Sequence, residues 1–182
     1  HMDITHIKET EEQLKEATNK AETLAITDTL TGLNNRLKLD DELDKEFQRA
    51  LRYGNPFSVV LLDLDKFKDV NDIFGHPVGD QTLKEAASII QDHCRRTDIV
   101  GRWGGEEFLV ICPETNLAGA LQLAENLRKA FETHIFPVIG EKTSSFGVAS
   151  YREGDAIQTI MERVDKALYD AKEKGRNRVE VI

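Results

Sequence analysis

The sequence Arg102-Trp103-Gly104-Gly105-Glu106-Glu107-Phe108 runs directly into the apolar stretch Leu109–Cys112. Another apolar segment begins just before it at Ile99-Val100, so the glycine pair lies between two predicted strands. Glycine accepts the positive φ that a tight turn demands, and we expect a β-hairpin with the glycine pair at its tip. Because strand side chains alternate between faces, Glu106 and Glu107 should point to opposite sides. Taken alone, the pattern is more typical of an ordinary tight hairpin with a solvated acidic edge than of a functional site.

Helices alternate with strands and hairpins around this stretch, which predicts an α+β fold with a mixed sheet covered by helices. The continuous β-branched and leucine run Ser58–Asp63 is typical of a strand buried on both faces. A second hairpin is expected over residues 136–139 and 143–150. Amphipathic spacing predicts helices over residues 36–53, 67–74, 117–134 and 156–174, one more after His76–Asp80, and a last strand over 178–182.

Composition limits the class of protein. A length of 182 residues suits one domain with an appendage, and a net charge of -9 argues against a nucleic acid polymer as partner. A local basic pocket for a small phosphate compound stays open. Cys94 and Cys112 lie in apolar patterns, as expected of buried thiols in a reducing compartment. His1-Met2 resembles the remainder of a cleaved expression tag, so we expect a cytoplasmic domain of a longer protein that could be membrane-tethered.

The first segment, residues 3–26, is free of glycine and proline and is expected to be a helical coiled-coil linker. Its apolar and small residues recur alternately three and four positions apart, at Ile7, Thr10, Leu14, Ala17, Ala21 and Leu24. The stripe is short and contains weak core residues, so we expect a weak parallel dimer, with a single solvated helix as the alternative. Residues 27–36 form a polar, turn-rich elbow after it.

Carboxylates converge near the end of the buried strand. Asp63 ends that strand, and Glu106 can approach it if the hairpin is the neighbouring element. Two carboxylates and a backbone carbonyl such as that of Leu64 suit a hard cation, Mg²⁺ above all, with Mn²⁺ as the alternative. Asp65 is better explained as an N-cap for the helix at 67–74 than as a ligand. The sequence does not favour zinc, because the five His and two Cys show no ligand spacing.

Cationic and amide groups that could bind a nucleotide lie nearby in the sequence. Lys68 follows the acidic strand end, and Asn71 and Asp80 have groups of the kind that read a purine edge, although Asp80 is equally suited to cap a helix. Neither a P-loop nor a Gly-x-Gly-x-x-Gly fingerprint exists. Basic residues cluster where the last helix ends, where they could simply complement the helix dipole: Lys172, Lys174, Arg176 and Arg178.

Residues 27–182 resemble the GGDEF domain family, the bacterial diguanylate cyclases, in the variant with glutamate third. Five ordered motifs carry the resemblance: Asp28-x-Leu30-Thr31-Gly32-Leu33-x-Asn35-Arg36, Asp63-Leu64-Asp65-x-Phe67-Lys68-x-Val70-Asn71-Asp72-x-Phe74-Gly75-His76-x-x-Gly79-Asp80, Gly104-Gly105-Glu106-Glu107-Phe108, Ser145-Phe146-Gly147-Val148-Ala149 and Ala167-Leu168-Tyr169-x-Ala171-Lys172-x-x-Gly175-Arg176-Asn177. Each motif alone is weak, but the five in this order and spacing are specific.

The resemblance implies a palm-like domain of the nucleotidyl cyclase type, with a mostly antiparallel five-stranded sheet, that condenses two GTP to cyclic di-GMP and two pyrophosphates. It also implies site roles. By the resemblance, Asp63, the Leu64 carbonyl and Glu106 would bind the metal, and Glu107 would assist deprotonation of the 3′-hydroxyl. Asn71 and Asp80 would bind guanine. The phosphates would be bound by Lys68, Lys172 and Arg176, and Gly104 and Gly105 would make other contacts with the substrate.

Regulation and assembly are also implied. Arg95-x-x-Asp98, five residues before the glycine pair, matches the family's product-binding inhibitory site, with an ordinary polar turn as the alternative. The family joins two domains around one active site, so a homodimer is expected, and residues 3–7 resemble the exit of an upstream PAS-type sensor. A catalytically weak receptor for cyclic di-GMP or GTP is the competing function, although the intact glutamate pair and Asp63 favour the enzyme.

Overall fold

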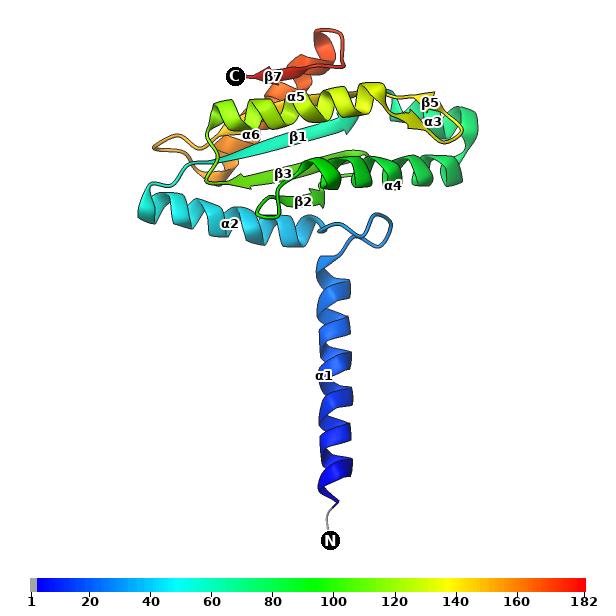
Figure 1. Cartoon of the computed structure of the whole chain (residues 1–182). Coiled ribbons are helices and arrows are strands. Elements are labelled where there is room, and N and C mark those ends of the chain that lie inside the picture. Colours follow the sequence, from blue (N-terminus) through cyan, green and yellow to red (C-terminus); the bar gives the residue numbers. More distant parts are fainter. Residues whose placement is uncertain (1–2) are drawn as a thin grey trace.

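The computed structural model describes residues 3–182, so the expected tag remainder, His1-Met2, lies outside the described residues. The described chain has six helices and seven strands. Figure 1 shows a layered body from which the first helix projects as a stalk. The body therefore contains all the strands, and the stalk contains none.

A five-stranded sheet in the order β2-β3-β1-β6-β7 forms the centre of the body. Strand β1 (Phe57–Leu64) pairs antiparallel with β3 (Glu107–Pro113) and with β6 (Ser144–Ser150). Strand β2 (Ile99–Arg102) is antiparallel to β3, and β7 (Val179–Val181) is parallel to β6. The predicted fold, a mixed and mostly antiparallel five-stranded sheet flanked by helices, is confirmed.

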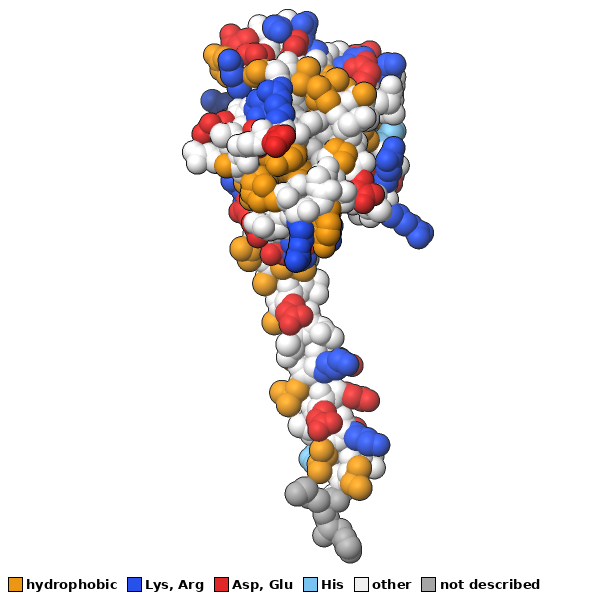
Figure 2. All heavy atoms as spheres, turned by 90° about the vertical axis from the view of Figure 1, so that its left-hand side faces the viewer, with side chains coloured by type: hydrophobic (Ala, Val, Ile, Leu, Met, Phe, Trp, Pro, Cys, Tyr) orange, Lys and Arg blue, Asp and Glu red, His pale blue; other side chains and the backbone are white. Residues whose placement is uncertain are grey.

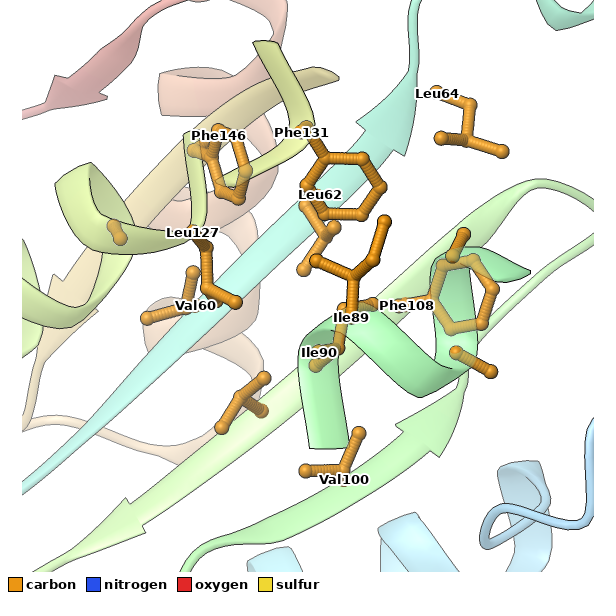
Figure 3. Close-up of a cluster of buried hydrophobic side chains, with 14 of the residues drawn as sticks. Val60, Leu62, Leu64, Ile89, Ile90, Val100, Phe108, Leu127, Phe131 and Phe146 are labelled. Atoms are coloured by element: carbon orange, nitrogen blue, oxygen red, sulfur yellow. The ribbon is translucent and has the colours of Figure 1, made fainter. Parts of the chain in front are cut away.

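Two helix layers cover the sheet. On one face lie α4 (His76–His93) and α5 (Leu117–Thr133), packed on Val60, Leu62 and Phe108 (Figure 3). On the other lie α2 (Arg36–Tyr53) and α6 (Ile157–Glu173), packed on Val59, Leu61 and Leu109. Both sets of side chains on β1 are buried, as predicted for a strand covered on both faces. The short helix α3 (Phe67–Phe74) packs against α4.

The predicted second hairpin is wrong. Strand β4 (Ile135–Phe136) pairs with β5 (Gly140–Glu141) in a separate two-stranded ribbon. A positive φ angle at Val138 (71°) turns the chain inside residues 136–139, which were expected to be one strand, and a second one at Gly140 (75°) follows directly. The residues from Ser144 onward instead pair with β1, because their side chains are buried there on both faces of the sheet.

Three local expectations about caps and turns are also wrong. The N-cap of α3 is Lys66, with φ of 54° and no side-chain cap bond, so Asp65 does not cap it. Helix α4 begins at His76, which places Asp80 inside the helix and excludes the cap alternative. The glycine pair is in the loop before β3, but neither Gly104 nor Gly105 has a positive φ. A longer loop, residues 103–106, relieves the need for it.

Helix α1 (Ile4–Ile26) agrees with the predicted helical linker. It begins after Asp3, whose carboxylate accepts the Thr5 N–H at 3.0 Å, and none of its residues is buried. Figure 2 shows hydrophobic side chains exposed among charged ones along it. Leu14 and Leu24 are 64% and 61% exposed, so the stripe has no partner within the described chain. No helix in residues 3–182 is long and apolar enough to cross a membrane.

Candidate active site

The end of β1 brings the predicted carboxylates together. Asp63 pairs in register with Glu107 across the β1–β3 ladder, and it is only 5% exposed. The Leu64 N–H donates to the Glu106 carbonyl at 3.4 Å, so the loop residue Glu106 runs alongside the last residue of the strand. The metal candidates Asp63, Leu64 and Glu106 therefore meet at one end of the sheet, as the sequence predicts.

The two glutamates are not neighbours on one strand. Glu106 belongs to the loop, and only Glu107 begins β3. Residues opposite each other in an antiparallel pair share a face, so Glu107 shares the face of Asp63, toward α2 and α6. The expectation that strand alternation separates the glutamates is wrong because the strand starts one residue later.

Charge at this end of the sheet is dominated by carboxylates. Burial raises the pKa of Asp63 to about 6, the ion pair with Lys172 opposes that rise, and Glu106 and Glu107 add to it. Burial also raises the pKa of Glu107, and Glu106 and Asp165 add to the rise. Lys172 Nζ bonds Asp63 Oδ2 and is the cation that partly balances the group. A further cation would therefore be favoured here.

The donor set fits a hard divalent cation. Carboxylate and carbonyl oxygens are the ligands that Mg²⁺ takes, usually only one or two carboxylates together with water and substrate phosphates. Within residues 3–182, no group of three His, Cys, Asp or Glu side chains lies close enough to hold a metal ion. The candidate set is two carboxylates and one backbone carbonyl, which leaves room for ligands from a substrate.

The predicted purine-reading residues lie where α3 packs on α4. The Asn71 side chain lies against the α4 backbone: a Cβ built on the buried Gly79 would lie 1.9 Å from Asn71 Oδ1. Asp80 is the next residue along α4 and is exposed. The structure therefore brings Asn71 beside the position of Asp80, and it leaves Lys68 exposed in the first turn of α3.

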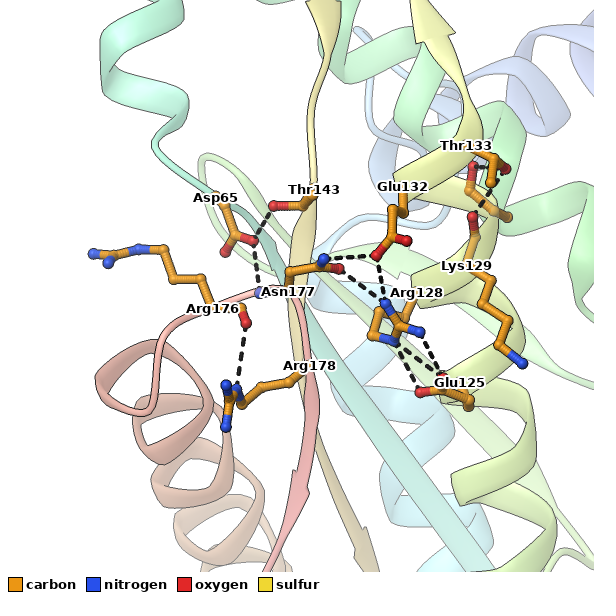
Figure 4. A network of polar contacts seen from close by, with 11 residues as sticks. Asp65, Glu125, Arg128, Lys129, Glu132, Thr133, Thr143, Arg176, Asn177 and Arg178 are labelled. Atoms are coloured by element: carbon orange, nitrogen blue, oxygen red, sulfur yellow. Dashed lines mark hydrogen bonds and ion pairs between the residues drawn. The ribbon is translucent and has the colours of Figure 1, made fainter.

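Arg176 lies in a turn that Asp65 anchors (Figure 4). The Asp65 carboxylate is 5% exposed and accepts bonds from Thr143 Oγ1 and Ser145 Oγ, both at 2.6 Å, and from the Asn177 N–H at 3.1 Å. Arg176 and Asn177 both have positive φ, 63° and 47°. Asp65 thus ties the turn between α6 and β7 to the end of β1. Sequence reasoning missed this role because the three partners lie far away in the chain.

Two arginines that sequence reasoning did not assign hold the hairpin tip. Arg102 pairs with Asp28 at 3.3 Å and donates to the Gly105 carbonyl at 2.8 Å and 3.1 Å. The Arg36 guanidinium lies 3.3 Å from the centre of the Trp103 ring and donates to the Trp103 carbonyl at 3.2 Å. The tip that carries the glycine pair is thereby fixed to the elbow and to α2. These contacts could not be predicted locally, because Arg36 and Asp28 lie far upstream of the hairpin in the sequence.

Arg95 and Asp98 form the turn between α4 and β2. Asp98 Oδ2 accepts the Arg95 N–H at 2.8 Å, and the Asp98 N–H donates to the Arg95 carbonyl at 3.1 Å. Both residues line a cavity of about 380 Å³ with Gly32, Gln91 and Arg96. Asp98 therefore stabilises the turn, as the alternative of an ordinary polar turn predicts. The Arg95 side chain is exposed and stays available to a ligand.

The architecture is that of the palm-like nucleotidyl cyclase fold, with acidic groups where the central strand meets a hairpin. The chain belongs to the GGDEF domain family: the family model described as "Diguanylate cyclase, GGDEF domain" matches residues 25–178.

Similar proteins agree with this assignment. The response regulator PleD of Caulobacter vibrioides is 43% identical over 162 residues, which cover 86% of this chain and 36% of PleD. Diguanylate cyclase DgcM of Escherichia coli is 39% identical over 177 residues, 97% of this chain and 42% of DgcM. The chain therefore spans less than half the length of these curated relatives.

Solved structures match both parts of the molecule. The coiled coil and GGDEF domain of DgcB from Caulobacter crescentus, in complex with c-di-GMP, aligns with a TM-score of 0.93 at 32% identity, over 98% of this chain and 97% of that one. The active GGEEF domain of a diguanylate cyclase from Vibrio cholerae aligns with a TM-score of 0.77 at 40% identity, over 80% of this chain and 95% of that one. The likeness to DgcB includes the helical linker.

Proposed function

We propose that this chain is the catalytic part of a diguanylate cyclase, which condenses two GTP to cyclic di-GMP and two pyrophosphates as a Mg²⁺-dependent homodimer. The observation that carries the proposal is the meeting of Asp63, Glu106, Glu107 and Lys172 at one end of β1. Membership of the GGDEF family and the similarity to named diguanylate cyclases support it.

Asp63, the Leu64 carbonyl and Glu106 would hold the metal, with Mn²⁺ as an alternative to Mg²⁺. Bound there, the cation would neutralise charge on the phosphate oxygens of the substrate. Asp63 is now paired with Lys172. With a cation bound to that carboxylate, the Lys172 ammonium would be available to a substrate phosphate.

The chemistry needs a base for the nucleophile. The 3′-oxygen of one GTP bonds to the α-phosphorus of the other, the bond from that phosphorus to the bridging oxygen breaks, and pyrophosphate leaves. The hydroxyl proton must go to a nearby acceptor. Glu107 is half-buried and its raised pKa makes it a stronger proton acceptor than an exposed glutamate, which supports it in this role.

The remaining substrate contacts follow from the positions of the candidate residues. Asn71 and Asp80 would read guanine, because a carboxylate can accept from both the ring N–H and the exocyclic amine. The phosphates would lie near Lys68, Lys172, Arg176 and the start of α3, where no side chain caps the helix. A Cβ built on Gly105 would meet no atom within 4 Å, and one built on Gly104 would lie 3.3 Å from Glu107 Oε2. The absence of side chains at both glycines would leave the hairpin tip accessible to substrate.

Assembly and control belong to the same proposal. Two domains, each with one GTP, would face each other, and the exposed stripe of α1 would join the two chains in a coiled coil. We further propose an upstream PAS-type sensor, a cytoplasmic location and inhibition by product at Arg95 and Asp98. Replacing Arg95 by Ala should relieve inhibition by added cyclic di-GMP, and unchanged inhibition would remove that assignment.

The proposed activity is tested by incubating the protein with GTP and Mg²⁺ and identifying the products. Cyclic di-GMP and pyrophosphate should form from GTP, and no cyclic dinucleotide should form from ATP. Asp63→Asn should abolish product without loss of the folded state, whereas the exposed Asp92→Asn on α4 should keep activity. Tight binding of cyclic di-GMP without any turnover of GTP would favour the receptor instead.

A further inference from the structure

A second group of cations borders the candidate active site. Lys66, Lys142 and Arg176 line a cavity of about 360 Å³ together with Asp65, Thr143 and Asn177. The cavity adjoins the site because Asp65 follows Asp63 by two residues at the end of β1. Its volume lies in the range of small-molecule sites.

These three cations have no ion-pair partner in residues 3–182. Neither Lys66, Lys142 nor Arg176 has a carboxylate oxygen within 4.0 Å, although other Lys and Arg side chains form twelve ion pairs in a chain of net charge -9. Unpaired cations that share one cavity repel each other, so their gathering costs free energy unless an anion enters.

The acidic groups at the cavity do not neutralise these cations. Asp65 accepts three hydrogen bonds from its neighbours, and both of its oxygens are used. Glu141 lines the same cavity but is exposed. Lys142 is half-buried, and burial lowers its pKa, while Asp69 and Asp65 raise it only at longer range. An entering anion would therefore meet available positive charge.

We propose that Lys66 and Lys142, together with Arg176, bind the two terminal phosphates of the nucleoside triphosphate and hold the pyrophosphate after cleavage. This inference rests on the proposed role of Arg176 and extends it to two lysines that no other part of the site uses. Asp65 anchors the turn that carries Arg176 (Figure 4), so the backbone that presents this arginine to the cavity is held in place before the anion arrives.

The test measures binding without turnover, by calorimetry with Mg²⁺ present. The three probes are GMP, inorganic pyrophosphate and a GTP analogue whose α,β-bridging oxygen is replaced by methylene, which cannot release pyrophosphate. Lys142→Gln and Lys66→Asn should each weaken binding of pyrophosphate and of the analogue by at least about threefold, and leave GMP unchanged. Asn suits position 66 because it tolerates the left-handed backbone there.

A matched control separates this effect from a general loss of positive charge. Lys129→Gln on α5 removes one cation whose side chain points away from Arg176 in Figure 4, and it should leave all three affinities unchanged. Unchanged pyrophosphate and analogue binding in both cavity variants, or no pyrophosphate binding by the unsubstituted protein, would overturn the inference. Failure of the proposed cyclase activity would show separately, as absence of cyclic di-GMP from GTP.

Discussion

At the scale of single residues, the sequence predicted the acidic centre better than its surroundings. Asp63 and the glutamates belong to short motifs next to apolar runs, and they do meet in space, although the strand begins at Glu107 and not at Glu106. The role of Asp65 could not be predicted, because its partners Thr143, Ser145 and Asn177 come from other parts of the chain. A buried carboxylate is explained only by the groups that hydrogen-bond to it.

Gly79 is a residue at which a single methyl group should matter. Its missing Cβ leaves the space that Asn71 Oδ1 occupies, and Phe67 lies 3.3 Å from the same point. Gly79→Ala should displace Asn71 and lower the free energy of unfolding by about 1–3 kcal/mol. The KM for GTP should rise as well. Ser88→Ala, at an exposed position of the same helix, is the control, and equal KM values for both variants would contradict this account.

Asp155 gives a prediction for pH. Hydrogen bonds from Arg163 at 2.8 Å and 2.9 Å lower the pKa of this carboxyl to about 2, well below its ordinary value. A carboxyl with a lowered folded-state pKa stabilises the fold fully above its unfolded pKa and loses that contribution as pH falls toward its folded value. Asp155→Asn should therefore cost about 2 kcal/mol of unfolding free energy near neutral pH and clearly less near pH 3.

Urea unfolding followed by circular dichroism at both pH values would measure this difference. Asp72→Asn, a change at an exposed carboxyl on α3, should show little cost at either pH. A cost for Asp155→Asn that is the same in acid as at neutral pH would mean that the carboxylate charge is not what Arg163 stabilises.

At the scale of elements, the bounds of helices and strands were predictable where the hydrophobic periodicity is strong, but the pairing of strands was harder to predict. The helices at residues 36–53 and 67–74 and the buried strand at the centre were predicted from local pattern. The second hairpin failed because residues 143–150 find their partner in β1, far away in the chain, rather than in the adjacent segment. Pairing of strands is a property of the whole sheet, which a local pattern does not contain.

Asp65 joins three elements, and its removal should therefore be felt in all of them. Asp65→Ala leaves the Thr143 and Ser145 hydroxyls and the Asn177 N–H without their acceptor, at an expected cost of about 3 kcal/mol in unfolding free energy. Hydrogen exchange should also increase at the turn that carries Arg176. Asp69→Ala, at an exposed position of α3, serves as control, and a loss no greater than in that variant would refute the anchoring role.

At the scale of the whole molecule, the class of fold followed from the order of elements, but the assembly did not. Helix α1 was predicted as a coiled-coil linker and is a helix without buried residues, whose apolar stripe is not buried by any other element of the described chain. A helix with a narrow apolar stripe of this kind is stabilised when a second helix packs against the stripe. The proposed homodimer therefore makes a prediction about that stripe.

Leu14→Asp places a charge on the stripe and should weaken dimerisation, with a lower rate of cyclic di-GMP formation per chain at low protein concentration. The thermal stability of the body should not change, because Leu14 is 64% exposed and packs on none of it. Gln13→Asp adds the same charge at the neighbouring position off the stripe and should behave like the unsubstituted protein. Equal rates and equal sedimentation for both variants would count against the coiled coil.

The most direct test of the central claim, that two copies of this domain share one active site, is the rate of cyclic di-GMP formation per chain, measured with GTP and Mg²⁺ over a wide range of protein concentration. We predict that this rate rises with concentration and then levels off once most chains are dimeric. A rate per chain that is the same at every concentration, or no cyclic di-GMP at any of them, would contradict it.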